Sequence, residues 1–261
     1  MLKTVKQSME NIETILGRHQ HEDLIHLMSD KRILVTGGKG SVGQELALRC
    51  PNAIITDIEE LDVTDGKRFW YPEDWQDIEY VIHLAGDKHA PHGEVTPFET
   101  LDINTQGVQN VINLFPNAHH ILASTCKACN PETVYGATKL ISERLILNHG
   151  GTVARFYNVV ETQGNVFDIW KTEPREVYDC HRYFISLAEA VGLLIKCLDL
   201  KGRWAVNPGH IRSMLDIFTQ LKYEGTVKPR RRGDRESEVL CSTSEQFAYK
   251  GSLLHIVSHH D

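Results

Sequence analysis

Short apolar runs alternate with helical stretches between residues 32 and 156, and this alternation limits the possible folds more than any other feature. The apolar runs are typical of buried strands and cover Arg32–Thr36, Ala53–Asp57, Glu79–Gly86, His119–Thr125 and Gly151–Tyr157. Helical spacing of apolar residues, together with start and stop signals, predicts helices over Ser41–Arg49, Phe98–Phe115 and Thr133–Asn148. Strands without polar alternation, separated by helices, indicate a parallel sheet covered on both faces. We therefore predict an α/β fold with a doubly wound parallel sheet.

A glycine-rich turn joins the first predicted strand to the first predicted helix. The segment TGGKGSVG, residues 36–43, places Gly37, Gly40 and Gly43 three positions apart. Glycines let the backbone approach a pyrophosphate, and the free N–H groups at a helix N-terminus favour an anion. Asp57 ends the next strand, where a carboxylate accepts hydrogen bonds from an adenosine ribose and repels a 2′-phosphate. The pattern predicts a Rossmann-type domain that prefers NAD to NADP. Because no lysine follows the turn as in G-K-[ST], a P-loop NTPase is excluded.

The parts of the chain outside this region are less regular. Residues 1–30 are polar, with apolar positions at loose helical spacing, and predict a helical extension. After Tyr157, helices expected over Ser186–Asp199 and Ser213–Lys222 stand among polar loops. We therefore expect an extension at 1–30, the NAD-binding domain at 31–156 and a small C-terminal substrate cap at 157–261.

Charge and composition limit the partners of the chain. Lys and Arg total 28 against 35 Asp and Glu, a net charge of −7, so neither nucleic acid nor an anionic membrane is an expected partner. No apolar run approaches the ~20 residues of a membrane span. Six thinly spread cysteines predict reduced thiols and a cytoplasmic location. The 14 histidines lack the spacing of a metal site, so no metal is expected.

Tyr135 and Lys139 lie four residues apart at the start of a predicted helix, so their side chains share one face. A tyrosine hydroxyl ordinarily loses its proton near pH ~10, but a neighbouring ammonium ion and an oxidised nicotinamide both favour the phenolate and lower the pKa. Tyr135 would then accept the proton of a substrate alcohol while hydride leaves the same carbon. Thr125 or Ser124 would donate a hydrogen bond to the same oxygen. The pattern predicts an oxidoreductase step on an alcohol.

Several motifs resemble the extended short-chain dehydrogenase/reductase superfamily: TGGKGSVG, HLAG, the Asn of DINTQGVQNV, and YGATK. Longer segments between about residues 15 and 191 are similar to the polysaccharide-biosynthesis branch that contains the UDP-N-acetylglucosamine 4,6-dehydratases. Among them are GDKHAPHGEVTPFETLDINTQGVQNVI, STCKACNPETVYGATKLISERLI and ARFYNVVETQGNVFDIW. The tail GDRESEVL resembles a shortened form of that branch's closing segment.

The resemblance implies a role for each matching position. Cofactor contacts are implied for Gly37, Gly40, Ser41, Val42, Gly43, Asp57, Asp62, Val63, Ala85, Gly86, Asn104 and Lys139. Catalytic positions are implied for Thr125, Cys126, Lys127, Tyr135 and Lys139. Contacts to a nucleotide-diphosphate sugar are implied for Lys88, His89, Asn158, Arg182 and Arg232. A homo-oligomer is expected because relatives assemble. The implied reaction begins with oxidation at C4 of the sugar, in polysaccharide or glycan precursor synthesis.

One position departs from the family pattern. The family usually has Ser-Thr-Asp-Lys where this chain has Ser124, Thr125, Cys126 and Lys127. In a dehydratase, Lys127 would remove the C5 proton, and the family's Asp, at the position of Cys126, would act as the acid that helps the C6 hydroxyl to leave. A thiol, with an ordinary pKa of ~8.5, suits that second role less well. Three interpretations stay open: a 4,6-dehydratase, a 4- or 5-epimerase or reductase without dehydration, and a catalytically idle NAD-binding sensor. The Tyr135/Lys139 pair favours an enzyme.

Overall fold

The computed structural model describes Ile12, Leu16 and residues 31–65, 75–172, 174–230 and 235–258. The predicted helical extension at 1–30, apart from Ile12 and Leu16, lies outside the described residues, as does Arg232. Within the described ranges, no helix has the length and apolar character needed to cross a lipid bilayer.

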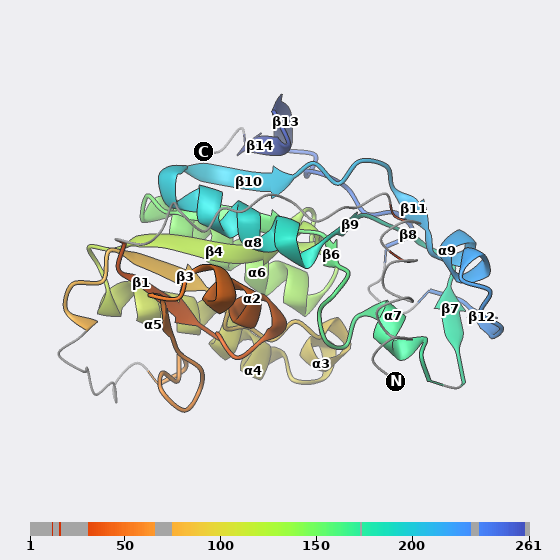
Figure 1. Ribbon diagram of the computed structural model, residues 1–261, viewed down its shortest axis with the longest axis horizontal. Helices are drawn as coiled ribbons and strands as arrows, with labels where there is room; N and C mark the ends of the chain where they lie inside the picture. The colour runs from red at the N-terminus through yellow and green to blue at the C-terminus, as the bar shows by residue number, and fades with distance from the viewer. Residues whose placement is uncertain are drawn as a thin grey trace.

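Among the described residues, eight strands form one central sheet in the order β13-β14-β10-β5-β4-β3-β1-β2 (Figure 1). The bounds are β1 (Ile33–Thr36), β2 (Ile54–Ile55), β3 (Tyr80–His83), β4 (His119–Thr125), β5 (Thr152–Phe156), β10 (Gly202–Val206), β13 (Glu245–Lys250) and β14 (Leu253–Ser258). Neighbours from β2 to β10 pair in parallel, whereas β14 and β13 add antiparallel strands at one edge. The predicted doubly wound α/β fold is confirmed.

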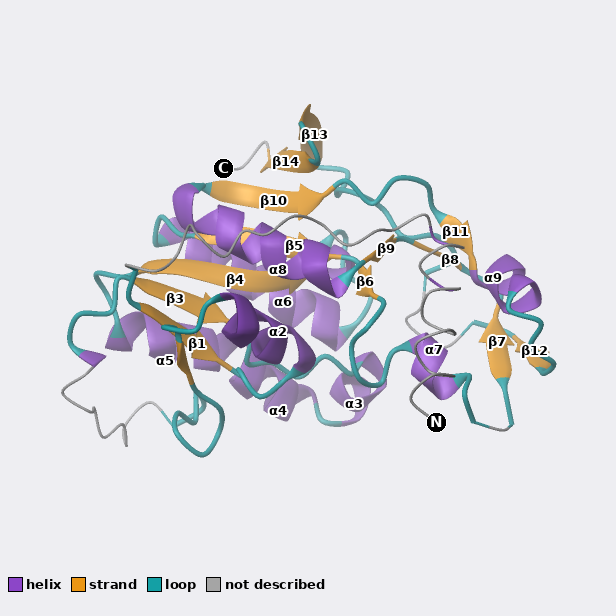
Figure 2. Cartoon of the chain, in the orientation of Figure 1, coloured by secondary structure: helices purple, strands orange, loops and turns teal. Residues whose placement is uncertain are grey.

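Helices cover both faces of the sheet (Figure 2). One face carries α2 (Ser41–Arg49) and α8 (Leu187–Lys196), which contact each other. The other carries α3 (Ala90–Val95), α4 (Pro97–Leu101), α5 (Gly107–Leu114) and α6 (Val134–Asn148). Short helical turns are η3 (Asp102–Gln106), η4 (Cys126–Ala128) and η5 (Cys197–Asp199). The turn η3 is π-helical and divides the helix predicted over Phe98–Phe115; such π segments are frequent at functional sites.

Neighbouring residues of the central strands belong to different cores. Ile121 of β4 and Ala154 of β5 join the core that includes Leu46 of α2. The adjacent residues Leu122 and Val153 join a separate core on the α6 side. Successive side chains of a strand point to opposite faces, so strands covered on both faces bury residues at successive positions, and most of these residues are apolar. This burial explains why the strands were recognisable in the sequence as continuous apolar runs.

The sheet does not end where the NAD-binding domain was expected to end, at residue 156. Helix α8 and strands β10, β13 and β14 all come from the segment expected to form the cap, yet they complete the sheet and one of its helical layers. Helix α8 begins with a capping box, in which Ser186 accepts from the Glu189 N–H and the Glu189 side chain accepts from the Ser186 N–H. Strand β10 then pairs in parallel with β5, which repeats the strand–helix–strand pattern of the preceding region.

The rest of the C-terminal half forms a small cap beside the sheet (Figure 1). Its elements are β6 (Asn158–Val159), α7 (Val166–Ile169), β7 (Glu176–Tyr178), β8 (His181–Arg182), β9 (Phe184–Ile185), β11 (Arg212–Ser213), α9 (Met214–Gln220) and β12 (Thr226–Lys228). Trp170, Phe184 and Phe218 lie in its apolar core, and Ile12 packs there as well. The cap therefore has its own apolar core, which is formed by residues that precede α8 and residues that follow β10 in the sequence.

A buried ion network joins α6, β5, β10 and β13 beneath the sheet's C-terminal edge. Arg155 donates to both oxygens of Glu143, at 2.8 and 2.7 Å, and to both oxygens of Glu245, at 2.7 and 2.8 Å. Arg203 donates to Glu143 at 3.0 Å. The side chains are at most 3% exposed. Buried charges of this kind are tolerated because each has an opposite charge and several hydrogen bonds.

A second buried polar pair links β3 to β4. The Nε2 of His120 donates to the Phe115 carbonyl at 2.9 Å, so its Nδ1 accepts the 2.8 Å hydrogen bond from Nε2 of His83. Burial lowers the pKa of His120 to about 4 and holds that of His83 well below its ordinary value. Both rings are therefore neutral in the folded protein near pH 7.

We expect this pair to make the fold sensitive to acid. The unfolded chain binds a proton at His120 near its ordinary pKa of ~6.5 and the folded chain only near 4, so stability is lost as the pH falls through this window. Between pH 7 and pH 5 the loss from His120 alone is about 2 kcal/mol. Urea unfolding of H120Q should show a correspondingly smaller pH dependence than the wild type. The exposed His210 supplies the control H210Q, and an equal slope for H120Q and H210Q would contradict the account.

Candidate active site

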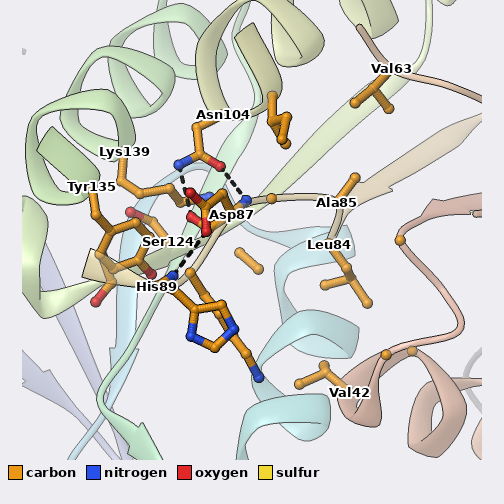
Figure 3. A pocket seen from close by; sticks show the side chains of 18 of the residues that line it. Val42, Val63, Leu84, Ala85, Asp87, His89, Asn104, Ser124, Tyr135 and Lys139 are labelled. Carbon is orange, nitrogen blue, oxygen red and sulfur yellow. Dashed lines mark hydrogen bonds between the residues drawn. The ribbon is translucent and has the colours of Figure 1, made fainter. Parts of the chain in front are cut away.

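A pocket of about 770 Å³ lies at the C-terminal ends of the parallel strands (Figure 3). The segments that follow β1, β2 and β3 and the ends of β4 and β5 all contribute to its wall. Predicted site residues that line it are Gly37, Gly40, Ser41, Val42, Gly43, Asp57, Asp62, Val63, Ala85, Gly86, Lys88, His89, Asn104, Thr125, Tyr135 and Lys139. In doubly wound sheets ligands bind at this edge. The structure thus brings the predicted glycine turn and the predicted Tyr–Lys pair to one pocket.

The glycine turn fits a pyrophosphate group. A Cβ on Gly37 would lie 2.4 Å from the Ala85 nitrogen, and one on Gly43 would lie 2.3 Å from the Gly38 carbonyl oxygen, so packing requires both glycines. A Cβ on Gly40 would meet the Gly37 carbonyl oxygen at 3.4 Å, an ordinary contact, so packing does not require this glycine. Gly40 begins α2 without a side-chain cap, and the first turn of that helix has no acidic residue. These features leave N–H groups and the positive end of the helix dipole available to an anion.

The acidic residue after β2 is held rigidly at the pocket wall. One oxygen of Asp57 accepts from the Lys39 N–H at 3.0 Å, and the other accepts from the Ile58 N–H at 2.9 Å. The ammonium group of Lys39 pairs with Glu60 at 3.1 Å and with Glu59. Lys39 is the one cation among the residues described for the glycine turn, 36–43, and it pairs with these two carboxylates. The pocket wall beside Asp57 therefore stays acidic.

Asn104 connects the loop after β3 to helix α6. Its Oδ1 accepts from the Asp87 N–H at 2.9 Å, and its Nδ2 donates to the Asp87 carbonyl and to Thr138 at 3.0 and 3.1 Å. The side chain lies in the π-helical turn η3 and is fully buried. Its amide therefore fixes the spacing between this loop and the helix that carries Tyr135 and Lys139 (Figure 3).

Asp87 was missed by the sequence analysis. Its carboxylate accepts from Thr100 at 2.6 Å and pairs with His92 at 2.9 Å, and although burial raises its pKa, these contacts bring the pKa below the ordinary value. His92 gains the reciprocal effect, because the bond to Asp87 raises its pKa. The available signal was that a charged residue, Asp87, directly follows the strand predicted over Glu79–Gly86.

Tyr135 and Lys139 both lie in the first turns of α6, which begins with a side-chain cap from Thr133 to the Gly136 N–H at 3.1 Å. In the protein alone, burial raises the pKa of Tyr135, while Lys127 and a hydrogen bond with Thr125 act in the opposite direction. In the protein without a dinucleotide, the pKa of Tyr135 is therefore raised and not lowered as predicted for the complex with oxidised nicotinamide. Burial lowers the pKa of Lys139 to about 8, although Glu143 opposes the shift.

Ser124 is held away from a simple catalytic role. Its hydroxyl donates to Glu143 at 2.6 Å, which ties it to the buried ion network. Thr125 has its oxygen 3.2 Å from the Lys127 N–H and forms a hydrogen bond with Tyr135. Of the two candidates, Thr125 is the one placed to share an oxygen with Tyr135.

Cys126 and Lys127 differ from the other predicted catalytic residues. Cys126 is 2% exposed and lines neither of the larger pockets, and burial raises the pKa of its thiol. Burial alone would lower the pKa of Lys127, but Glu238, 3.6 Å away, together with Cys126 and Tyr135, raises it to about 12. Lys127 is therefore an ammonium ion in the protein alone, and Cys126 does not line the main pocket. Their expected roles as base and acid stay predictions.

A second pocket of about 310 Å³ adjoins the first, and Lys88, His89, Val159 and Thr162 line both. Predicted substrate contacts that line it are Lys88, His89, Asn158 and Arg182. Its apolar side comes from the cap and includes Phe167 and Trp170. The Nζ of Lys88 donates to the Gln163 carbonyl at 3.0 Å, and the Gln163 N–H donates to Ser41 at 3.0 Å, so one cap loop contacts both the first pocket and the glycine turn.

The described cysteines and acidic residues offer no sign of metal or redox chemistry. Over the described ranges, no group of three His, Cys, Asp or Glu side chains gathers as metal ligands. Cys126 and Cys129 are free and buried, and burial raises the pKa of Cys129 to about 12. Reactive cysteines have lowered pKa values and partial exposure, which neither residue has.

Known proteins are similar to this chain in sequence and in fold. A UDP-N-acetylglucosamine 4,6-dehydratase (inverting) of Campylobacter jejuni is 36% identical over 214 residues, covering 65% of this chain and 64% of that enzyme. An uncharacterized membrane protein of Methanocaldococcus jannaschii is 32% identical over 225 residues, covering 69% of this chain and 67% of that protein. The chain therefore spans about two thirds of the length of these curated relatives.

The crystal structure of a UDP-glucose 4-epimerase from Thermotoga maritima, with UDP-glucose, superposes with a TM-score of 0.69 at 18% identity. The match covers 81% of this chain and 90% of that one and shows the shared fold. The sequence profile of a family described as polysaccharide biosynthesis protein matches residues 58–246. The chain belongs to this polysaccharide biosynthesis protein family, within the extended short-chain dehydrogenase/reductases.

Proposed function

We propose that the protein is an NAD-dependent enzyme that oxidises C4 of a nucleotide-activated sugar, as a 4,6-dehydratase or epimerase in polysaccharide precursor synthesis. The observation that carries the proposal is that Tyr135, Lys139 and Thr125 line the same pocket as the glycine turn. The second pocket, with Arg182 and Asn158 on its wall, adjoins the first and is large enough for further parts of such a substrate. The Campylobacter relative, a UDP-N-acetylglucosamine 4,6-dehydratase by name, supports the same substrate class.

The residues around the glycine turn fit a dinucleotide. The N-terminus of α2 would hold the pyrophosphate, Asp57 the adenosine ribose, and Asp62 and Val63 the adenine, while Ala85, Gly86 and Lys139 would line the nicotinamide side. When bound, an oxidised nicotinamide supplies a hydride acceptor and a positive charge at this end of the pocket. The acidic wall at Asp57 supports NAD rather than NADP.

The chain's own groups handle the proton of the sugar alcohol. Tyr135 would accept the proton of the C4 hydroxyl, and Thr125 would donate a hydrogen bond to the same oxygen. Lys139, whose pKa burial brings to about 8, would hold the adjacent ribose and stabilise the phenolate when charged. Lys127 places a second positive charge near Tyr135.

One observation favours epimerisation or simple oxidoreduction over dehydration. A dehydratase needs a base for the C5 proton and an acid for the C6 hydroxyl, yet Lys127 is held as an ammonium ion and Cys126 is buried outside both larger pockets. Oxidation at C4 needs neither residue in those roles. A 4- or 5-epimerase or reductase without dehydration is therefore our second candidate, and a catalytically idle NAD-binding sensor is the third.

Mass spectrometry and NMR separate the three candidates. Purified protein is incubated with UDP-, GDP- and dTDP-sugars, and the products are analysed. Loss of one water identifies a dehydratase, and unchanged mass with a new stereoisomer identifies an epimerase. No turnover of any sugar by protein that still binds NAD would contradict the proposed enzyme and leave the sensor.

The charge of Asp57 should set the choice of cofactor. We expect D57N to shift the ratio of NAD to NADP affinity by about tenfold toward NADP, because the repulsion of a 2′-phosphate is removed. The amide oxygen of Asn keeps one of the two backbone N–H groups as a donor, and the loss of the other acts on both dinucleotides alike. Isothermal titration with each dinucleotide measures the ratio on protein freed of bound nucleotide. D77N, at an exposed residue outside the pocket, is the control. An unchanged ratio in D57N would show that this carboxylate does not face the ribose.

We also propose a cytoplasmic location. Cys126, Cys129, Cys197 and Cys241 are free, and the first three are buried as thiols. Unpaired buried thiols are typical of a reducing compartment. The homo-oligomer suggested by the family resemblance stays a prediction.

A further inference from the structure

A single carboxylate lies directly behind the second pocket. Glu238 belongs to the segment between the cap and β13, and its side chain is only 4% exposed. It faces a small cavity of about 20 Å³ whose walls include Cys126, Lys127 and Arg182. No proposed catalytic step uses this residue, although a buried carboxylate is costly unless its oxygens are satisfied.

The oxygens of Glu238 are satisfied by groups from three separate segments. The Nδ2 of Asn158 donates to both oxygens, at 3.1 and 2.9 Å, and the Tyr183 N–H donates to one at 3.0 Å. The Lys127 ammonium and the Arg182 Nε each lie 3.6 Å from Oε1. Lys127 lies in η4, Asn158 in β6 and Arg182 in β8, and Tyr183 lies between β8 and β9. All four are distant from residue 238 in the sequence.

Three of these four partners form part of the second pocket. Lys127, Asn158 and Arg182 all line it, whereas Glu238 does not. Glu238 therefore holds two cationic side chains and one amide of this wall without lining the pocket itself. Such a wall suits the anionic diphosphate of a nucleotide sugar.

We propose that Glu238 is a positioning residue for nucleotide-sugar binding, which orients Lys127, Asn158 and Arg182 from behind the wall of the second pocket. The proposal rests on the proposed function, because it assigns the second pocket to the substrate. Glu238 does not touch the substrate in this arrangement and acts through the three side chains that do.

The charge state of Lys127 is the property that Glu238 controls. The titratable and charged groups facing Lys127 are Glu238, Cys126, Tyr135 and Arg182. Burial and Arg182 favour the neutral amine, and the attraction of Glu238 is the largest of the effects that favour the ammonium ion. With Glu238 neutralised, Lys127 should lose its proton at lower pH and its attraction for a diphosphate with it.

The test compares E238Q with E236Q. Glu236 lies two residues from Glu238 and is exposed, and its carboxylate forms an ion pair with Arg230 at 3.8 Å. E236Q therefore removes a negative charge from the same segment at a residue that does not line the pocket. Isothermal titration measures the Kd for UDP-N-acetylglucosamine and UDP from pH 7 to pH 10, with bound NAD measured in each preparation. We expect E238Q to bind about tenfold more weakly at pH 7 with unchanged NAD content. The ratio of the E238Q Kd to the E236Q Kd should also grow as the pH rises, because Lys127 loses its proton earlier in E238Q. Ionisation of the ligand affects both variants equally and therefore does not change this ratio.

A second variant separates charge from geometry and covers the case in which E238Q fails to fold. E238D keeps the negative charge but shortens the side chain, so affinity should fall while its alkaline profile follows E236Q. A constant Kd ratio across the pH range for E238Q would indicate a merely structural role and overturn the proposal. Equal affinity in E238Q and E236Q would overturn it as well, while leaving the proposed function intact. If wild type and E236Q bind no nucleotide sugar, the proposed function fails and this proposal falls with it.

Discussion

Replacing Tyr135 with phenylalanine should lower turnover of the nucleotide sugar by about 10²–10⁴-fold, the usual contribution of a positioned general acid or base. The substitution removes one oxygen and keeps the ring, so the packing at the start of α6 should persist. The glycine turn and Asp57 lie on other elements of the pocket, so bound NAD should be unchanged. The steady-state rate with the best sugar of the panel, measured beside NAD content, checks both expectations.

The pH profile adds a second criterion. Burial raises the pKa of Tyr135 in the protein alone, so the phenolate forms more readily as the pH rises, and wild-type kcat/KM should increase on the alkaline side. Y249F is the matched control, because Tyr249 is 61% exposed on β13, away from the pocket. Equal turnover in Y135F and Y249F would exclude Tyr135 as the base.

Replacing Arg155 with methionine should destabilise the fold by about 3–5 kcal/mol, because it leaves the buried carboxylates of Glu143 and Glu245 with Arg203 as their shared cation. For a chain of this size the change corresponds to a fall in Tm of about 6–20 °C. Glu143 also accepts from Ser124 at the pocket floor, so the same variant should weaken activity of whatever protein remains folded. Thermal and urea unfolding measure the first effect.

A surface ion pair provides the comparison for this prediction. Lys31 and Asp199 lie 2.9 Å apart, with side chains 24% and 69% exposed. Exposed pairs contribute about 0–1 kcal/mol, so K31M should change the stability little. A similar small change in R155M would show that the buried network does not hold α6, β5 and β13 together.

Much of the fold follows from local patterns in the sequence. Every predicted parallel strand formed, because each contains a short apolar run. The strands β1, β3, β4 and β5 are mostly buried, whereas the edge strand β2 is half-buried. Helix α2 has its predicted bounds, since glycine begins it and Pro51 follows its end. The boundary at 156 was less predictable, because β10 reads as a short run among polar loops and its pairing with β5 is a tertiary choice.

Only part of the candidate site could be predicted from the sequence. The glycine turn, Tyr135 and Lys139 were predictable because each belongs to one short motif. Glu238 was not, since its partners Lys127 and Asn158 are distant in sequence and only the folded cap brings them together. The charge states of Cys126 and Lys127 were not predictable for a related reason: burial raises the pKa of the Cys126 thiol and Glu238 raises that of Lys127, and neither effect is visible in the sequence.

The fate of deuterium at C4 of the sugar tests the central claim most directly. The protein is incubated with UDP-N-acetylglucosamine, or the active sugar of the panel, deuterated at C4, and the product is examined by NMR and mass spectrometry. Oxidation at C4 with Tyr135 as base predicts a slowed reaction in which the label stays in the product, at C6 after dehydration or at C4 after epimerisation. Product that has exchanged its label with water, or that forms with no isotope effect from an intact C4–D bond, would contradict the account.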